Sequence, residues 1–133
     1  MIVYEDDASA VAPELLEGFF VGWPSPPSRE RHLELLRGSA HVLLAREEDG
    51  RVVGFVTAIS DGVLSAYIPL LEVLPEYQGR GIGTELMRRM LAKLRGLYMV
   101  DLSCDAALEP FYRRLGLQVW DRGMGLRNRD ALR

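Results

Sequence analysis

The stretch that decides the fold reads Val73-Leu74-Pro75-Glu76-Tyr77-Gln78-Gly79-Arg80-Gly81-Ile82-Gly83-Thr84. The apolar run that enters it, Ser65 to Leu74, is typical of a largely buried strand. Apolar residues then recur on one face of a helix, at Ile82, Leu86, Met90, Leu91 and Leu94. Where a strand feeds directly into a helix, the first helical N–H groups are unpaired and lie at the positive end of the helix dipole. The glycines leave room for an anion to approach these amides.

By itself, a glycine-rich pattern of this kind is more typical of a turn that binds no ligand. Two familiar phosphate loops do not fit it. A Walker loop requires Gly-Lys-Ser/Thr, which is absent. A dinucleotide fingerprint requires wider glycine spacing, although Asp101 stands about 20 residues further on, where that motif places its acidic residue.

The rest of the chain alternates between helical and strand patterns. Before the decisive stretch, we expect a short strand at Ile2-Val3-Tyr4 and an amphipathic helix from Pro13 that carries Leu15, Leu16, Phe19 and Phe20. A second helix should begin after its cap, Ser28, and stop at Gly38. A hairpin of His41–Arg46 with Val52–Ile59 should follow. After it, we expect a strand over Tyr98–Cys104, a short helix ending near Gly116, and closing strands at Val119-Trp120 and Met124–Arg127. This order predicts one α/β domain, residues 1–133, with a mixed sheet.

Composition limits the class of protein. The 133 residues are 48% apolar and 26% charged, which is ordinary for a soluble domain, and no apolar run approaches the roughly 20 residues that span a membrane. Glu5-Asp6-Asp7 stands where a signal peptide would be basic. The single Cys104 allows no internal disulfide and, with only His32 and His41, predicts no metal site. A net charge of −3 disfavours nucleic acid. A cytoplasmic protein is the default expectation.

Two segments together resemble a known family. The decisive stretch is similar to the central motif of the GNAT superfamily of N-acetyltransferases, Gln/Arg-x-x-Gly-x-Gly/Ala. Downstream, Asp105-Ala106-Ala107-Leu108-Glu109-Pro110-Phe111-Tyr112-Arg113-Arg114-Leu115-Gly116-Leu117 resembles the later family segment Asn-x5-Phe-Tyr-x3-Gly-Phe. The two matches follow the family's order and approximate spacing. The resemblance covers nearly the whole chain and implies the GNAT fold, a mostly antiparallel mixed sheet with splayed central strands flanked by helices.

The resemblance also implies a cofactor site. The strands ending near Leu74 and Cys104 splay apart, and the pantetheine arm of acetyl-coenzyme A lies in the gap. Backbone groups around Val73 pair with the pantetheine amides, as an added strand would. The implied cofactor-binding residues are Val73, Leu74, Gln78, Gly79, Arg80, Gly81, Ile82, Gly83, Thr84 and Asp105. At Asp105 the family usually has Asn, and Asp can accept a hydrogen bond from the arm but cannot donate one.

Three residues are implied in catalysis. Tyr112 matches the tyrosine that the family places beside the sulfur, where a phenol can protonate the departing thiolate. Alternatively, its ring simply packs the last helix. Glu72 and Asp101 each interrupt an apolar strand, where a carboxylate is costly unless it is paired, solvated or used. Family members place amine-receiving carboxylates on either strand, and Glu72 is slightly favoured. Each could equally reach solvent or an arginine at a sheet end.

The sequence therefore predicts an enzyme that moves an acetyl group from acetyl-coenzyme A directly to a primary amine of a small molecule or a protein. Phe19, Phe20 and Trp23, with the proline-rich loop, fall where the family builds its acceptor site. The alternatives are a catalytically silent acyl-coenzyme A sensor, and an interaction protein that uses the loop Trp23 to Pro27. An exposed edge after Gly116 leaves homodimerisation by strand pairing open.

Overall fold

The structure, a computed structural model, describes residues 1–132. Its strands are β1 (Val3–Glu5), β2 (His41–Arg46), β3 (Val52–Ser60), β4 (Ser65–Val73) and β5 (Met99–Asp101). Its α-helices are α1 (Arg29–Gly38), α2 (Ile82–Lys93) and α3 (Glu109–Arg114), and short 3-10 turns cover Pro13–Leu16, Pro75–Tyr77, Ala106–Leu108 and Arg129–Leu132. Among residues 1–132, no helix combines the length and the apolarity that crossing a membrane requires.

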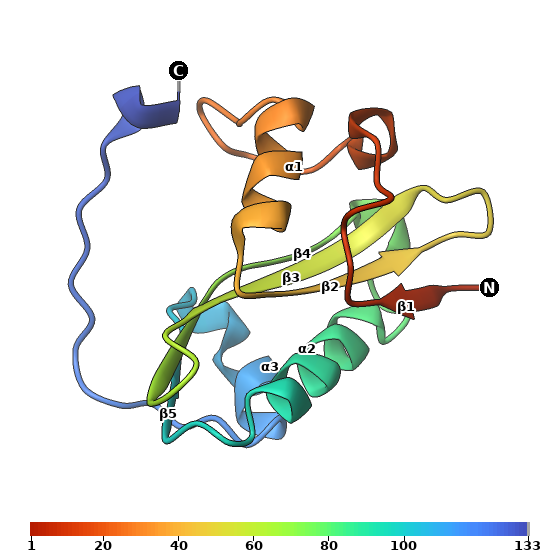
Figure 1. The fold of residues 1–133 in the computed structure, drawn as a ribbon. Helices are drawn as coiled ribbons and strands as arrows, with labels where there is room; N and C mark the ends of the chain where they lie inside the picture. The colour runs from red at the N-terminus through yellow and green to blue at the C-terminus, as the bar shows by residue number, and fades with distance from the viewer. Residues whose placement is uncertain (133) are drawn as a thin grey trace.

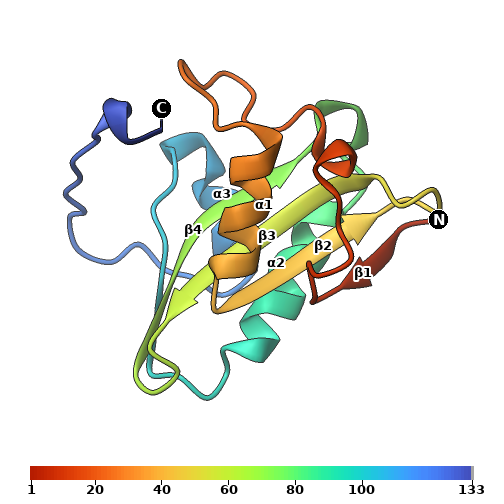
Figure 2. The same cartoon turned by 45° about the horizontal axis from the view of Figure 1, so that its top comes forward.

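The strands form one sheet in the order β1-β2-β3-β4-β5. Every neighbouring pair is antiparallel except β4 and β5, which are parallel. The helix α2 connects these two parallel strands, as a parallel connection requires. Figures 1 and 2 show α1 on one face of the sheet and α2 with α3 on the other. This arrangement confirms the predicted α/β class and mixed sheet.

Each face of the sheet has its own apolar core. Along β2, Val42 and Leu44 pack on the α1 side, whereas Leu43 and Ala45 pack on the α2 side, as strand alternation requires. On the α2 side, the helix contributes the buried residues Ile82, Leu86, Met87, Met90 and Leu94 to the core. The predicted apolar face of the helix is therefore confirmed. Met87 also belongs to it, and Leu91 is only half-buried.

The α2 helix packs very closely on β3 at Gly54. A Cβ at that position would lie 3.1 Å from Leu86 Cδ1 and 3.3 Å from Ile82 Cγ2, closer than side chains normally tolerate. A side chain at this position would push Leu86 and Ile82 outward by a few tenths of an ångström, so glycine lets the first turns of α2 pack close to the sheet. That contact determines where the N-terminus of the helix lies relative to the end of β4.

The predicted helix after Pro13 is wrong beyond its first turn. The chain forms a single 3-10 turn over Pro13–Leu16, and Phe20 then adopts a positive φ of 63° between Gly18 (95°) and Gly22 (83°). A helix cannot continue through left-handed residues. The apolar spacing that suggested a helix instead directs side chains from a bent loop into the α1-side core, where Leu16 and Phe20 are buried.

The closing strands predicted at Val119-Trp120 and Met124–Arg127 are also absent, because residues 117–128 pair with no strand in the described chain. The strand predicted over Tyr98–Cys104 is shortened to Met99–Asp101, since only these residues pair with β4. The helix ending near Gly116 is confirmed as α3. The Ser28 cap is confirmed by its hydroxyl oxygen, which accepts a hydrogen bond from Arg31 N–H at 3.1 Å.

His32 of α1 is a buried polar residue without a partner. Its side chain is 1% exposed, packs against the rings of Phe19, Phe20 and Phe55, and its Nε2 makes no hydrogen bond within residues 1–132. Burial disfavours the charged imidazolium and lowers the pKa of His32 from 6.5 to about 4.

We predict that this burial makes the protein sensitive to acid. Between pH 6.5 and 4 the unfolded chain protonates His32 while the folded chain does not, so the stability contributed by the neutral side chain is lost as pH falls through this range. Between about pH 7 and pH 4.5, the free energy of unfolding measured with urea should fall by about 2 kcal/mol more in wild type than in His32→Leu. The control is His41→Leu, at a half-buried histidine, whose free energy of unfolding should fall between the two pH values as much as that of wild type. Equal losses in wild type and His32→Leu would contradict the prediction.

Candidate functional site

A gap between β4 and β5 forms the centre of the candidate site. The two strands pair only through Ser65–Tyr67 with Met99–Asp101, and β4 then continues to Val73 paired with β3 alone. The β3–β4 register shifts between Thr57 and Ile59, which marks a bulge in β4 after Tyr67. Beyond the paired residues, the side of β4 that faced β5 has no partner strand. This is the splay that the family resemblance implied.

The glycine turn meets the end of β4 and carries a row of free amides. Gly81 caps α2 at φ 81°, Gly79 has φ 80°, and nothing lies within 4 Å of a Cβ built at either position. Within residues 1–132, the backbone N–H groups from Gly79 to Thr84 donate no hydrogen bond of good geometry. Free amides at a helix start, with open space above them, fit the pyrophosphate of coenzyme A.

Gln78 was expected to belong to this row of free amides, but its own N–H group is hydrogen-bonded. Its backbone N–H donates to Pro75 O at 3.3 Å, and its side-chain Nε2 donates to Val73 O at 3.0 Å. Gln78 therefore ties the glycine turn to the last residue of β4. Its neighbour Arg80 lies over the ring of Tyr77, 4.8 Å from the centroid, on the exposed side of the turn. A second lone pair on Val73 O stays available to a pantetheine amide.

Tyr112 lies on α3, and its neighbour Phe111 lies close to Gly83 at the start of α2. A Cβ at Gly83 would lie 3.7 Å from both Phe111 Cζ and Val73 Cγ2, so the start of α2, the end of β4 and α3 converge here. Tyr112 packs edge-on to Phe111, and its ring is half-buried. Burial raises the pKa of Tyr112, and negative charge on nearby Cys104 raises it further. The phenol therefore keeps its proton at neutral pH.

Glu72 has a partner that the sequence did not reveal. Its Oε1 accepts a hydrogen bond from Phe20 N–H at 2.9 Å, and its Oε2 accepts one from Val21 N–H at 3.3 Å. The carboxylate thus holds the left-handed turn at Phe20 against the end of β4. Hydrogen bonds from two backbone amides, rather than solvent or an arginine, offset the cost of placing this charge in an apolar strand. No local sequence signal could show this link, since the donors are main-chain groups about 50 positions away.

The two aspartates lie elsewhere. Asp101 is exposed at the end of β5, in register with Tyr67, and Tyr67 Oη lies 3.1 Å from Ser103 Oγ on the following segment. Asp105 is also exposed, and its carbonyl accepts Leu108 N–H before α3. The structure brings Glu72, the glycine turn and the α3 aromatic pair to one end of β4, and leaves Asp101 at the other end of the gap.

A hollow of about 440 Å³ adjoins the turn that Glu72 holds. It lies between the 3-10 turn and the start of α1, and is lined by Leu16, Glu17, Gly18, Phe19, Phe20, Pro26, Pro27, Ser28, Arg29 and His32. The predicted acceptor residues Phe19 and Phe20 and the proline-rich loop do line it. Trp23 stacks edge-on to Phe20, 5.0 Å between centroids. The contribution of His32 from α1 was not predicted.

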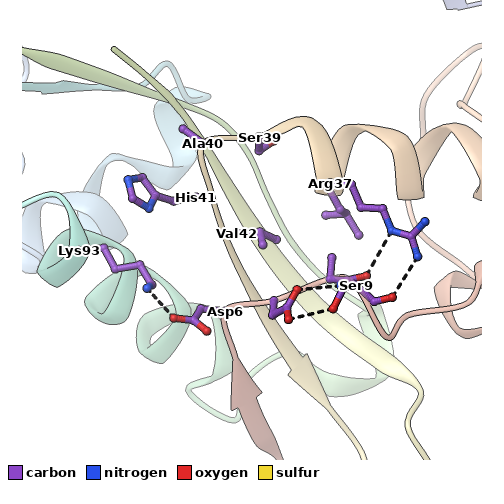
Figure 3. Close-up of a pocket in the computed structure, with 11 residues that line it drawn as sticks. Asp6, Ser9, Arg37, Ser39, Ala40, His41, Val42 and Lys93 are labelled. Atoms are coloured by element: carbon purple, nitrogen blue, oxygen red, sulfur yellow. Dashed lines mark hydrogen bonds and ion pairs between the residues drawn. The ribbon is translucent and has the colours of Figure 1, made fainter. Parts of the chain in front are cut away.

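A second hollow, about 460 Å³, lies at the far end of the sheet (Figure 3). Its charged groups are already engaged. Lys93 Nζ pairs with Asp6 at 2.6 Å, Asp7 accepts from Ser9, and the Arg37 guanidinium donates to the carbonyls of Ala8, Ser9 and Val11. This hollow opens where β2 begins, whereas the glycine turn follows the end of β4, so it takes no part in the candidate site.

Comparison with known proteins agrees with this geometry. Residues 8–117 match the model of the acetyltransferase (GNAT) family, and this chain belongs to that family. A solved structure of a candidate acetyltransferase from Deinococcus radiodurans R1 is 50% identical, superposes with a TM-score of 0.93, and covers 97% of this chain and 90% of its own.

Curated relatives are more distant. An uncharacterized N-acetyltransferase, ycf52, of Porphyra purpurea is 31% identical over 100 residues, 72% of this chain and 58% of its own length. The chloroplastic serotonin N-acetyltransferase 2 of Oryza sativa subsp. japonica is 35% identical over 107 residues, 74% of this chain and 52% of its own. The chain thus spans little more than half the length of these relatives.

The Glu72 link yields a prediction about the turn it holds. Glu72→Ala should leave the amides of Phe20 and Val21 without acceptors and speed their hydrogen exchange at least about tenfold, because a hydrogen bond to a charged group contributes about 1.5–3 kcal/mol. Amides in β3 should be unaffected. The control Glu76→Ala removes a surface carboxylate that pairs with Arg51 and should change neither amide. Unchanged exchange in Glu72→Ala would show that the carboxylate does not hold the turn.

Proposed function

We propose that this protein transfers an acetyl group from acetyl-coenzyme A to a primary amine of a small molecule or a protein. The observation that carries the proposal is the meeting of the free amides of Gly79–Thr84, the open end of β4 and the α3 pair Phe111-Tyr112. Family membership supports acetyl transfer, and relatives named as N-acetyltransferases support nitrogen as the acceptor atom.

Acetyl-coenzyme A supplies an activated thioester and is a co-substrate of the reaction. We propose that the amides of Gly79–Thr84 bind its pyrophosphate and that the free side of β4 near Val73 and Leu74 orders its pantetheine amides. Asp105, across the gap, can accept one further hydrogen bond. AAC(6')-Iy, solved in complex with a bisubstrate analog of coenzyme A, has a similar fold, with a TM-score of 0.69 at 16% identity.

Tyr112 is the proposed acid. The acceptor nitrogen forms a bond to the acetyl carbon and gives up one proton to a base, the carbon–sulfur bond breaks, and the thiolate receives the Tyr112 proton. The raised pKa of Tyr112 keeps the phenol protonated until that moment. Cys104 lies close enough to Tyr112 to influence its pKa, and we assign it no acyl-carrying role because neither histidine is its partner within residues 1–132.

Glu72 and Asp101 cannot serve the same amine. Asp101 of β5 lies opposite Tyr67 of β4, and Glu72 is five residues further along β4. Five residues span about 15 Å along a strand. We propose Glu72 for the acceptor side, because its carboxylate holds the turn that lines the aromatic hollow and has further lone pairs for an ammonium or a water. Asp101 remains the second candidate for the base.

Tyr112→Phe should lower kcat about 10²- to 10³-fold, because the thiolate would depart without a proton donor, while the Kd for acetyl-coenzyme A stays at the wild-type value. The assay is coenzyme A release across a panel of primary amines. Tyr98→Phe, which removes a hydroxyl from an 86% exposed ring, should be fully active. Full activity of Tyr112→Phe would eliminate the proposed acid. Binding of acetyl-coenzyme A by wild type with no turnover of any amine would instead indicate a sensor.

Gly81→Val should weaken coenzyme A binding at least about tenfold, because a side chain there shields the free amides and strains the left-handed backbone. Gly62→Val is the matched control. Gly62 has a similar φ of 75°, lies in the open turn between β3 and β4, and should lose a similar 1–2 kcal/mol or so of stability without changing affinity. Titration calorimetry with coenzyme A measures both. Equal affinities of the two variants would remove the amide turn as the phosphate site.

A further inference from the structure

The aromatic hollow between the 3-10 turn Pro13–Leu16 and the start of α1 has one polar side chain without a partner. Figures 1 and 2 show that turn and α1 side by side on one face of the sheet. Four polar side chains line the hollow: Glu17, Ser28, Arg29 and His32. Arg29 pairs with Glu17 at 2.9 Å, and the Ser28 hydroxyl oxygen accepts a backbone N–H of α1. Within residues 1–132, His32 Nε2 has no such hydrogen bond.

A histidine at this position is costly for the protein alone. The rings of Phe19, Phe20 and Phe55 pack against the imidazole at centroid distances of 5.3, 4.8 and 4.5 Å. An aliphatic side chain would fill such a place without a polar atom, whereas a buried nitrogen without a partner costs free energy. Buried polar groups in native proteins nearly always have a hydrogen-bond partner. Because His32 lines the hollow, a molecule bound there can supply the missing one.

The surroundings of His32 also define the charge of that partner. Burial lowers the pKa of His32 to about 4, so at neutral pH its ring is uncharged, with one nitrogen that donates and one that accepts. The cation that lines the hollow, Arg29, is already paired with Glu17. A carboxylate or a phosphate entering the hollow would therefore lose its hydration without gaining a counter-ion. A neutral hydroxyl matches the uncharged imidazole.

The remaining walls suit a flat apolar ring. Phe19, Phe20, Pro26 and Pro27 line the hollow, and aromatic rings pack well edge-on to such side chains. Its volume of about 440 Å³ is that of a small-molecule pocket. Phe20 also joins the hollow to the proposed acceptor side, because its N–H donates to Glu72 Oε1 at 2.9 Å. A ring in the hollow therefore lies beside the turn that this carboxylate holds.

We propose that the acceptor is a small aromatic primary amine with a neutral hydroxyl group, and that His32 selects it by a hydrogen bond to that hydroxyl. The inference rests on the proposed acetyl transfer. The aromatic body occupies the hollow, and the amine lies toward Glu72. His32 moves no proton in the reaction and is a specificity-determining residue. A lysine of a protein has neither the ring nor the hydroxyl, so the hollow favours a small molecule as the acceptor.

Coenzyme A release with matched amines tests this selection. Wild type should use tyramine with a kcat/KM at least about tenfold above that of phenethylamine, which lacks only the hydroxyl and would leave the buried nitrogen unpaired. The analogue of tyramine with a carboxylate in place of the hydroxyl should be a poorer substrate than either. Putrescine, which has no ring, tests the proposed function separately. Turnover of putrescine with no preference for tyramine over phenethylamine would overturn the inference and leave acetyl transfer standing.

Variants of His32 assign the preference to the imidazole. His32→Leu should abolish the roughly tenfold preference, and His32→Gln, whose amide can still form a hydrogen bond, should retain part of it. The control His41→Leu, at a half-buried histidine that lines the other hollow, should keep the wild-type preference. A purely structural role of His32 would change the activity on both amines alike. A preference that persists in folded His32→Leu would contradict the assignment.

Titration calorimetry with tyramine and phenethylamine makes the same comparison without turnover. Tighter binding of tyramine by wild type, lost in His32→Leu, would support the selection independently of acetyl transfer. Equal binding of the two amines by wild type would overturn it, and this comparison requires no variant to fold.

Discussion

The close contact of α2 with β3 at Gly54 sets the geometry on which the rest of the molecule depends. Because no side chain separates the helix from the strand there, the first turn of α2 lies directly beside the end of β4. The amides of Gly79–Thr84, which donate no hydrogen bond within residues 1–132, consequently lie next to the end of β4, beyond the point where its pairing with β5 stops. A small increase in the distance between helix and sheet would move the amide row away from Val73. The binding potential of the turn is thus a result of packing as much as of glycine.

The second organising contact is polar and joins the two halves of the site. Glu72 belongs to the strand that we propose orders coenzyme A, and its carboxylate holds the turn that lines the aromatic hollow. A cofactor that orders the end of β4 would therefore also order the acceptor side. The left-handed conformation of Phe20 costs free energy in isolation, and the two hydrogen bonds together with burial of its ring offset that cost.

Local patterns predicted the parts of the molecule that local interactions determine. The Ser28 cap, the β2–β3 hairpin and the apolar face of α2 follow from neighbours within a few residues, and the glycine turn with Tyr112 could be located from motif spacing. The errors occur where distant groups decide. Phe19 and Phe20 have helical spacing, but a carboxylate from β4 bends the chain there. Met124 and Leu126 have strand spacing, yet a strand forms only with a partner, and no segment of the described chain supplies it.

The manner in which Glu72 holds its turn has an evolutionary consequence. The carboxylate recognises two main-chain N–H groups, so the hydrogen bond from residue 21 does not depend on the side chain at that position. Val21 is 61% exposed and can change without disturbing the link. A lineage or a designer could therefore alter the Val21 side chain, on the proposed acceptor side, while the turn that presents it stays fixed. Acceptor preference could then drift by single substitutions, without a matching change in β4.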